Sequence, residues 1–266
     1  MANTAALSDR SICSAQPRSQ TSCCLKVPSK IVHDPDPSIY DQQLVFDSGG
    51  APTFDSPDIS TQDLWPPTPA PNLGITVRNL SSQASANQTR IDLSWSAWGI
   101  GMPRTPIGST FVNLARAGFP GSQVSVSYPT PPALMAAALF GLFVNVVNPY
   151  DTDLSNNAGE QTVNGFQTSK GGRSQSFVLP VRNPSGSTQT INLSAGPASV
   201  ASWATILPAT LTLGAGAQQN VTVSVVVPAA VPVSPPGTLF TAEIDVLATI
   251  GGAYLGGVNI AVLVDA

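Results

Sequence analysis

The residues of this 266-residue chain that could do chemistry are few and widely spaced. The single histidine, His33, precedes the proline-rich run 34–37, which is a poor setting for a nucleophile triad or a metal site. Four acidic residues are too isolated in the sequence to be recognised as a glycosidase pair: Asp92, Glu160, Glu243 and Asp245. The last two would share one strand face, which we expect to be the solvent face. No glycine-rich phosphate loop is present. The sequence therefore predicts no catalytic residue, no cofactor and no enzyme.

One stretch concentrates oxygen atoms of the kind that bind Ca²⁺. It spans residues 148–157 and contains Asp151, Asp153, Asn156 and Asn157. The same residue types hold tight hairpins, because their side chains bond to the nearby backbone. The spacing also lacks the glycine turn and the terminal glutamate of an EF-hand. We expect a turn here, with a calcium site as the alternative.

The three cysteines, Cys13, Cys23 and Cys24, all lie near the start of the chain. Their odd number and their spacing match neither a closed disulfide set nor a zinc pattern. Free thiols or a local bridge are one interpretation, and a disulfide between chains is the other.

Charge is sparse after residue 70, where about seven basic residues face about seven acidic ones. Without a basic patch, binding of nucleic acid through its phosphates is not expected. The net charge of -4 comes from the aspartates among the first 63 residues. The longest apolar run, 133–147, is shorter than the roughly 20 residues that span a bilayer, so we expect no membrane span. Residues 1–20 lack the apolar core of a secretory signal.

Residues 1–70 are predicted to form an extended, mostly irregular arm. Proline clusters at 34–37 and 65–71 break helices and remove backbone donors from any sheet. The apolar residues of this part are scattered between such breakers, so they cannot build a core. We expect the arm to clamp neighbouring subunits, with Phe46, Phe54 and Trp65 as its anchors at the interface.

After residue 71 the apolar residues alternate with period two, which is typical of strands with one buried face. The clearest runs are 91–95, 124–128, 177–181, 221–227, 244–248 and 258–264. Clusters of Gly, Pro, Asn and Ser separate these runs, as in antiparallel sandwiches. One alanine-rich run, 133–139, follows two prolines and predicts a short helix.

Two phrases occur twice. Residues 77–81 read Val-Arg-Asn-Leu-Ser and return at 181–185 with one change, and residues 91–94 return at 191–194 in the same way. This repeat predicts two copies of one domain. We therefore expect an all-β protein with two tandem immunoglobulin-like antiparallel β-sandwiches. The predicted parts of the chain are the arm at 1–70, sandwich 1 at 71–166, a linker at 167–172 and sandwich 2 at 173–266.

Tryptophans mark the expected cores and one exposed position. Trp203 is expected to fill the space between the sheets of the second sandwich. Trp95 and Trp98 differ by three positions in a strand, so they point to opposite faces. Trp98 is the possible exposed aromatic, able to stack on a sugar or to seat a protein partner.

Parts of both copies resemble known modules. Residues 177–183 and 211–216, with Trp203 between them, are similar to NEW3-like immunoglobulin-like modules of bacterial proteins. Residues 148–157 look like the last hairpin of a CARDB-type adhesion module, and Ser-Pro-Asp-Ile at 56–59 resembles the segment that precedes such modules. The resemblance implies tandem bacterial immunoglobulin-like modules, and it is specific for fold rather than for function.

Three functions remain open at this point. The leading one is a non-enzymatic structural subunit of a larger protein assembly, such as a virion, a tail-like phage particle or a bacterial surface fibre. Its partners would be other protein subunits, in a homo-oligomer or a hetero-assembly, and its location extracellular, on a cell surface or in a virion. The alternatives are an extracellular adhesion or glycan-binding module and an accessory domain of a secreted hydrolase.

Overall fold

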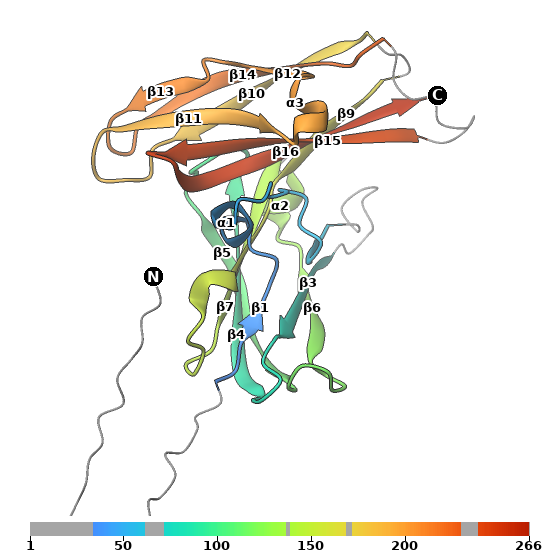
Figure 1. Cartoon of the computed structure of the whole chain (residues 1–266), viewed down its shortest axis with the longest axis vertical. Helices are drawn as coiled ribbons and strands as arrows, with labels where there is room; N and C mark the ends of the chain where they lie inside the picture. The colour runs from blue at the N-terminus through green and yellow to red at the C-terminus, as the bar shows by residue number, and fades with distance from the viewer. Residues whose placement is uncertain (1–33, 62–71, 137–138, 169–171, 230–238, 266) are drawn as a thin grey trace, which may run out of the picture. The chain divides into compact units, whose positions relative to one another are not determined.

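The computed structural model describes residues 34–61, 72–136, 139–168, 172–229 and 239–265. These residues form two antiparallel β-sandwiches of the immunoglobulin-like kind (Figure 1). Several residues discussed above lie outside the described residues: Cys13, Cys23, Cys24, His33 and Trp65.

The first sandwich has two sheets. One contains β1 (Pro37–Ser38), β2 (Ile59–Ser60), β3 (Asn72–Asn79) and β6 (Gln123–Pro129). The other has the order β5 (Thr105–Leu114), β4 (Ala86–Ala97), β7 (Phe140–Val147) and β8 (Ala158–Gln161). The helix α2 (Pro132–Ala136) joins β6 to β7, as the alanine-rich run predicts. The short 3-10 helix η1 (Leu154–Asn156) joins β7 to β8.

Strand alternation places the core of this sandwich between its two sheets. Leu73, Ile75 and Val77 of β3 are fully buried and meet the inward residues Ile91 and Leu93 of β4. The polar residues between them point outward, which is the expected result of a period of two. The predicted strand at 91–95 is therefore confirmed.

Residues 34–61 pack on their own chain, although they are as irregular as the sequence predicts. β1 and β2 pair with the two ends of β3 along one of its edges, and β6 pairs along the other. Asp58 accepts two hydrogen bonds of 2.6 Å from the guanidinium of Arg78, and it is almost fully buried. Ile39 and Ile59 belong to the sandwich core. This half of the arm therefore forms an edge of the first sandwich.

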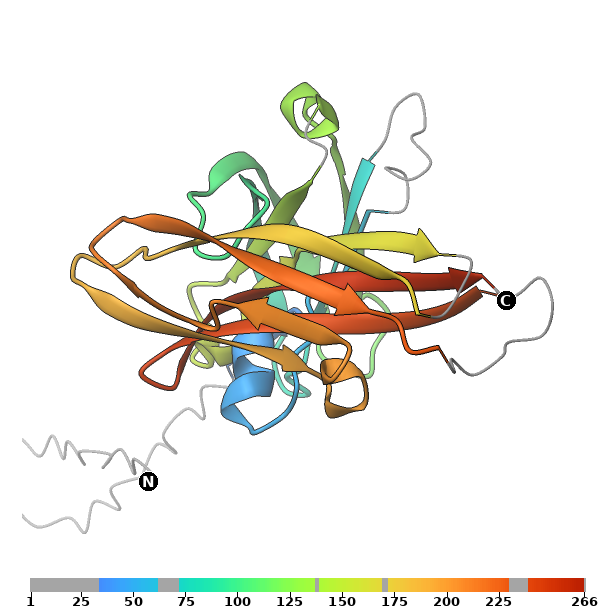
Figure 2. The same ribbon diagram turned by 90° about the horizontal axis from the view of Figure 1, so that it is seen from above.

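A short helix, α1 (Gln42–Asp47), interrupts this edge and lies beside β16 (Ala253–Asp265) in both views (Figures 1 and 2). Asp41 caps it, since its carboxylate accepts from the backbone N–H of Leu44 at 3.0 Å. The second oxygen of Asp41 accepts from the N–H of Ala158 at 2.9 Å, which fastens the helix to β8. The sequence gives little sign of this helix, because its six residues are fewer than two turns.

The second sandwich also has two sheets. One has the order β10 (Ser174–Arg182), β14 (Gln218–Val226) and β12 (Ala204–Leu207). The other has the order β13 (Thr210–Leu213), β11 (Gln189–Gly196), β15 (Leu239–Ile250), β16 and β9 (Val163–Thr168). The helix α3 (Ala198–Ala201) joins β11 to β12. The inward residues of β14 are Val221, Val223 and Val225, all buried, as the alternation predicts.

The boundary between the sandwiches differs from the linker expected at residues 167–172. β9 pairs in parallel with β16 from Val163↔Asn259 to Thr168↔Val264. Residues 163–168 therefore belong to the second sandwich, and the chain passes from one sandwich to the other at Thr162. A parallel pair has no alternation signal of its own in so short a strand, so the sequence did not reveal it.

The asparagine of the repeated phrase, Asn79 in one copy and Asn183 in the other, has the same structural role in both sandwiches. Asn79, at the end of β3, donates to the carbonyls of Ala84 and Ala115 and accepts from the N–H of Ser81. Asn183, at the end of β10, donates to the carbonyls of Ser187, Leu213 and Gly214 and accepts from the N–H of Ser185. Both side chains are buried. Each holds the turn after its strand, so the repeated phrase has a structural cause.

Candidate functional site at the junction of the sandwiches

A loop of the first sandwich extends the second one. After β4, the chain runs beside β10: the N–H of Ile100 donates to Pro180 at 2.9 Å, and the N–H of Arg182 donates back to Ile100 at 2.9 Å. Gly99 and Gly101 flank this contact with positive φ angles of 136° and 69°. A Cβ on either would lie within 2.6 Å of a β10 carbonyl oxygen. Glycine is therefore required on both sides of the inserted residue.

Trp98 enters the core of the second sandwich. Its side chain is only 7% exposed, it packs in that core together with Ile100, and its indole N–H donates to the carbonyl of Val178 at 3.3 Å. The expectation of an exposed Trp98 is wrong, because the chain crosses to the other sandwich directly after β4. Trp203, expected between the sheets, packs only at the margin of the same core, 6.2 Å from Phe240.

Phe54 forms a second link between the sandwiches. Its ring is fully buried and stacks on Tyr254 of β16, with centroids 6.4 Å apart. Its N–H donates to Asp245 at 3.0 Å, and its carbonyl accepts from Thr162 at 2.9 Å. The ring lies so close to Gly257 that a Cβ there would be 2.1 Å from Phe54. Phe54 is thus an anchor within its own chain, which corrects the expectation of an anchor on a neighbour.

The other two expected anchors were Phe46 and Trp65. Phe46, from α1, is partly buried and lies 6.1 Å from the ring of Tyr254. Its contact is also with its own chain. Trp65 falls outside the described residues, so its expected role stays a prediction.

A cluster of polar residues lies beneath Phe54 on the outer face of β15 and β16. Asn259 donates to Asp245 at 3.0 Å, and the N–H of Asn259 donates to Thr162 at 2.7 Å. Burial raises the pKa of the Asp245 carboxyl, and burial also raises that of Glu243. Both residues lie on the outer strand face as expected, but residues 53–56 cover Asp245, which is 8% exposed.

Glu160 of β8 is the most perturbed carboxyl of this junction. It is 9% exposed, and the hydroxyl of Tyr254 donates to it at 3.0 Å from the other sandwich. Burial raises the pKa of Glu160 to about 7, against the opposing effect of the positive charge on Arg104. A group with this pKa can hold or release a proton near neutrality.

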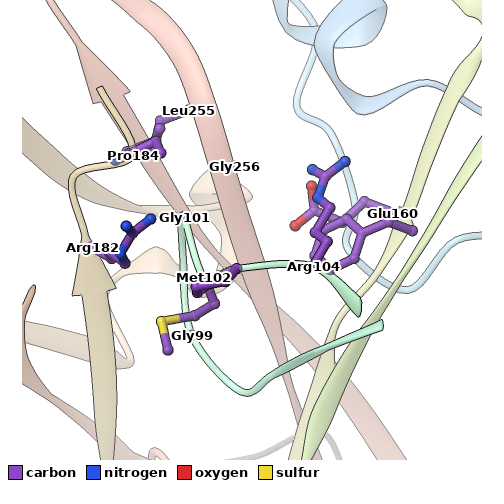
Figure 3. Close-up of a pocket in the computed structure, with 11 residues that line it drawn as sticks. Gly99, Gly101, Met102, Arg104, Glu160, Arg182, Pro184, Leu255 and Gly256 are labelled. Carbon is purple, nitrogen blue, oxygen red and sulfur yellow. The ribbon is translucent and has the colours of Figure 1, made fainter. Parts of the chain in front are cut away.

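Two cavities adjoin at the junction and share two residues. One, of about 330 Å³, lies between the inserted loop, β10 and β16, with Glu160 on its wall (Figure 3). The other, of about 320 Å³, lies on the outer face of β4, β5 and β7. Both are lined by Arg104 and Phe143. The guanidinium carbon of Arg104 sits 3.9 Å above the ring of Phe143, a cation–π contact that holds it in place.

Asp92 and Glu160 line these cavities and were considered above as isolated acidic residues, but the sequence did not point to the residues around them. Arg104 and Arg182 are isolated arginines, and Tyr254, which lines neither cavity but donates to Glu160, is one of four tyrosines. The one usable signal was Gly-Ile-Gly at 99–101, directly after a tryptophan, since two glycines around one apolar residue indicate a close backbone approach.

The oxygen-rich stretch after β7 forms a turn. Asp151 accepts from the N–H of Asp153 at 3.0 Å, and Asp153 accepts from the N–H of Ser155 at 3.1 Å, which caps η1. Asn157 donates to Asp151 at 2.9 Å, and Asn156 donates to Asp36 at 2.8 Å. The expected turn is confirmed. The carboxylates are bonded to N–H groups, and no group of three His, Cys, Asp or Glu side chains that could hold a metal occurs in the described ranges.

Comparisons with known proteins found little. No protein-family model matches the sequence, and no curated protein does. The resemblance to CARDB-type and NEW3-like modules therefore stays a prediction. Solved structures with a similar course include alpha-2-macroglobulin of Escherichia coli, activated by porcine elastase. It is 10% identical with a TM-score of 0.27, and the match covers 89% of this chain and 22% of that one.

Two other solved structures show a likeness of the same degree. Red sea bream transglutaminase is 8% identical with a TM-score of 0.27, over 88% of this chain and 32% of that one. The CupB6 tip adhesin of Pseudomonas aeruginosa is 10% identical with a TM-score of 0.23, over 74% of this chain and 90% of that one. The chain thus spans a third or less of the first two. In the described part of the chain, no helix has the length and apolar character needed to cross a bilayer.

Proposed function

We propose that this chain is a non-enzymatic structural subunit of an extracellular protein assembly, in which the two sandwiches act as one rigid piece. The observation that carries the proposal is the insertion of residues of the first sandwich into the core of the second. Trp98 and Ile100 of the first sandwich complete the core of the second, and Phe54 is buried between the two. A buried apolar junction of this kind restricts motion between the two sandwiches. Such rigidity suits a load-bearing or assembled subunit better than a binding module on a flexible tether.

The chemistry of the described polar residues supports a structural role. The most buried carboxylates bond to the fold itself: Asp58 to Arg78, Asp41 to the backbone of Leu44 and Ala158, and Asp245 to Asn259 and the backbone of Phe54. Glu160 is bonded to Tyr254 across the junction. These groups serve as polar ties between segments that are far apart in the sequence.

Contacts with neighbouring subunits are assigned to residues 1–33 in this proposal. Residues 34–61 are occupied in the first sandwich. The part before them carries Cys13, Cys23 and Cys24, an odd number that suits a bridge between chains. Particles of a bacterial surface or of a phage are the settings that agree with a sandwich pair that has few charges, no net charge and many Ser and Thr residues.

Light scattering tests the proposal on three proteins: the full chain, a chain that starts at Asp34, and the full chain with Ser at positions 13, 23 and 24. We expect the full chain to form large oligomers and the shortened chain to be a monomer with unchanged circular dichroism. The serine variant separates disulfide bridging from non-covalent attachment. Equal masses for the full and shortened chains would contradict the proposal.

A further inference from the structure

We propose that the two adjoining cavities form one groove that binds an acidic oligosaccharide, a chain of hexuronic acid units. This inference goes beyond the structural role and does not depend on it. The groove runs from the outer face of β4 and β7 to the tip of the β15–β16 hairpin, and Arg104 and Phe143 are common to both halves.

Two arginines give the groove its preference for an anion. Figure 3 shows Arg104 and Arg182 on opposite sides of the first cavity, with Glu160 beside Arg104. Within the part of the chain that the structure describes, neither guanidinium has an acidic partner within ion-pair distance. By contrast, Arg78 and Arg90 are both paired with aspartates. A carboxylate placed between Arg104 and Arg182 would supply the missing partner through charge-assisted hydrogen bonds, which guanidinium groups favour.

Side chains that can form hydrogen bonds with hydroxyl groups line the rest of the groove, and this favours a sugar as the ligand. In the second cavity Asp92 accepts from Ser109 at 2.6 Å and is paired with Arg90, which orients its remaining lone pairs. Asn145 lies opposite Asp92 on β7 and is exposed, so its amide can both donate and accept. Alternating donors and acceptors on a sheet face suit the hydroxyl groups of a sugar ring.

The apolar walls and the volumes agree with a ligand of that size. Met102, Pro184 and Leu255 face the first cavity together with the ring of Phe143. Such walls suit the apolar faces of pyranose rings. Each cavity is close to the lower limit of about 300 Å³ for small-molecule sites, and the two in series suit two or three sugar units.

The charge of Glu160 makes the site dependent on pH. The groups that face it are Arg104 from the loop before β5, Tyr254 from β16 and Thr162 after β8. When Glu160 is protonated, Arg104 is released from its field and the groove carries two uncompensated positive charges. When Glu160 is ionised, it repels an acidic ligand. Binding should therefore be tighter at pH 6 than at pH 8.

Isothermal titration calorimetry on the full chain tests the inference with three probes: trigalacturonic acid, maltotriose as a neutral sugar of equal length, and acetate as a plain carboxylate. We expect trigalacturonic acid to bind at least about tenfold more tightly than either of the others. Arg104→Gln and Arg182→Gln should each weaken it by about tenfold or more. The matched control is Arg116→Gln, since Arg116 also lies over a ring, that of Phe119, but outside the groove.

Each contrary result has a distinct meaning. Absence of binding by trigalacturonic acid overturns the inference, and equal binding of maltotriose or acetate overturns the claim of an acidic sugar. Unchanged binding in both arginine variants places the ligand elsewhere on the chain, which also overturns it. If Arg104→Gln loses its fold on circular dichroism, Arg182→Gln decides the question, because its partly exposed side chain lies at the end of β10.

Discussion

Replacement of Trp98 by alanine should destabilise the second sandwich, although Trp98 follows a strand of the first. The side chain is 7% exposed in the core of the second sandwich and donates one hydrogen bond to Val178. Truncation of a buried large aromatic costs about 3–5 kcal/mol, and the lost bond is part of that cost. Because a domain has only about 5–15 kcal/mol of stability in total, the loss is a large fraction of it.

The assay is urea denaturation followed by far-UV circular dichroism, with native-state hydrogen exchange on peptides from β10 and β16. We expect Trp98→Ala to lower the free energy of unfolding by about 4 kcal/mol and to reduce protection in both strands. Trp203→Ala is the matched control, and its marginal position predicts a loss of about 2 kcal/mol. The reasoning is refuted if Trp203→Ala costs more, or if protection is lost only within the first sandwich.

Three further predictions concern the junction and the repeat. The pKa of Glu160 is raised from 4.5 to about 7 in the folded protein, so the contribution of this group to stability is greatest below pH 4.5. The free energy of unfolding should fall by on the order of 3 kcal/mol as the pH rises from 4.5 through 7. Melting temperatures measured across this range should show that Glu160→Gln lacks this loss. Asn79→Ala and Asn183→Ala should each cost about 1–3 kcal/mol in urea titrations, since each leaves partly or fully buried carbonyl groups without a donor. Gly257→Ala should cost several kcal/mol, on the order of 3 or more, in the same titration, because the Cβ would meet the ring of Phe54 at 2.1 Å.

Each of these three has a control. For the glycine, Gly214→Ala has nothing within 4 Å of the added carbon and should be nearly neutral. For the glutamate, an equal pH dependence in Glu160→Gln and the unmodified chain would assign the effect to other carboxyls such as Asp245. For the asparagines, a cost confined to one of the two sandwiches would show that the repeated phrase does not have the same role in both.

The strands could be predicted from the sequence because their inner faces obey a local rule. Val221, Val223 and Val225 alternate with polar residues, and that pattern alone specifies a strand with one buried face. The paired asparagines could be recognised as a repeat, although their hydrogen bonds could not be deduced. Both features depend on residues that are close in the sequence.

The junction could not be predicted, because it depends on contacts between distant segments. Trp98 looks like the outward neighbour of Trp95 until the chain is seen to leave the first sandwich after Ala97. Phe54 sits among prolines in an irregular stretch, where nothing local indicates a fully buried ring. Glu160 acquires its raised pKa from burial between the sandwiches, against the lowering effects of Arg104 and of the hydrogen bond from Tyr254, and no spacing in the sequence reveals this environment.

Differential scanning calorimetry of the full chain tests most directly whether the two sandwiches form one rigid piece. Shared core residues should make them unfold together, in one transition whose calorimetric and van't Hoff enthalpies agree. In Trp98→Ala this single transition should divide into two, because the inserted loop no longer fills the second core. Two separate transitions in the unmodified chain would contradict the account, since they would mean that each sandwich folds without the other.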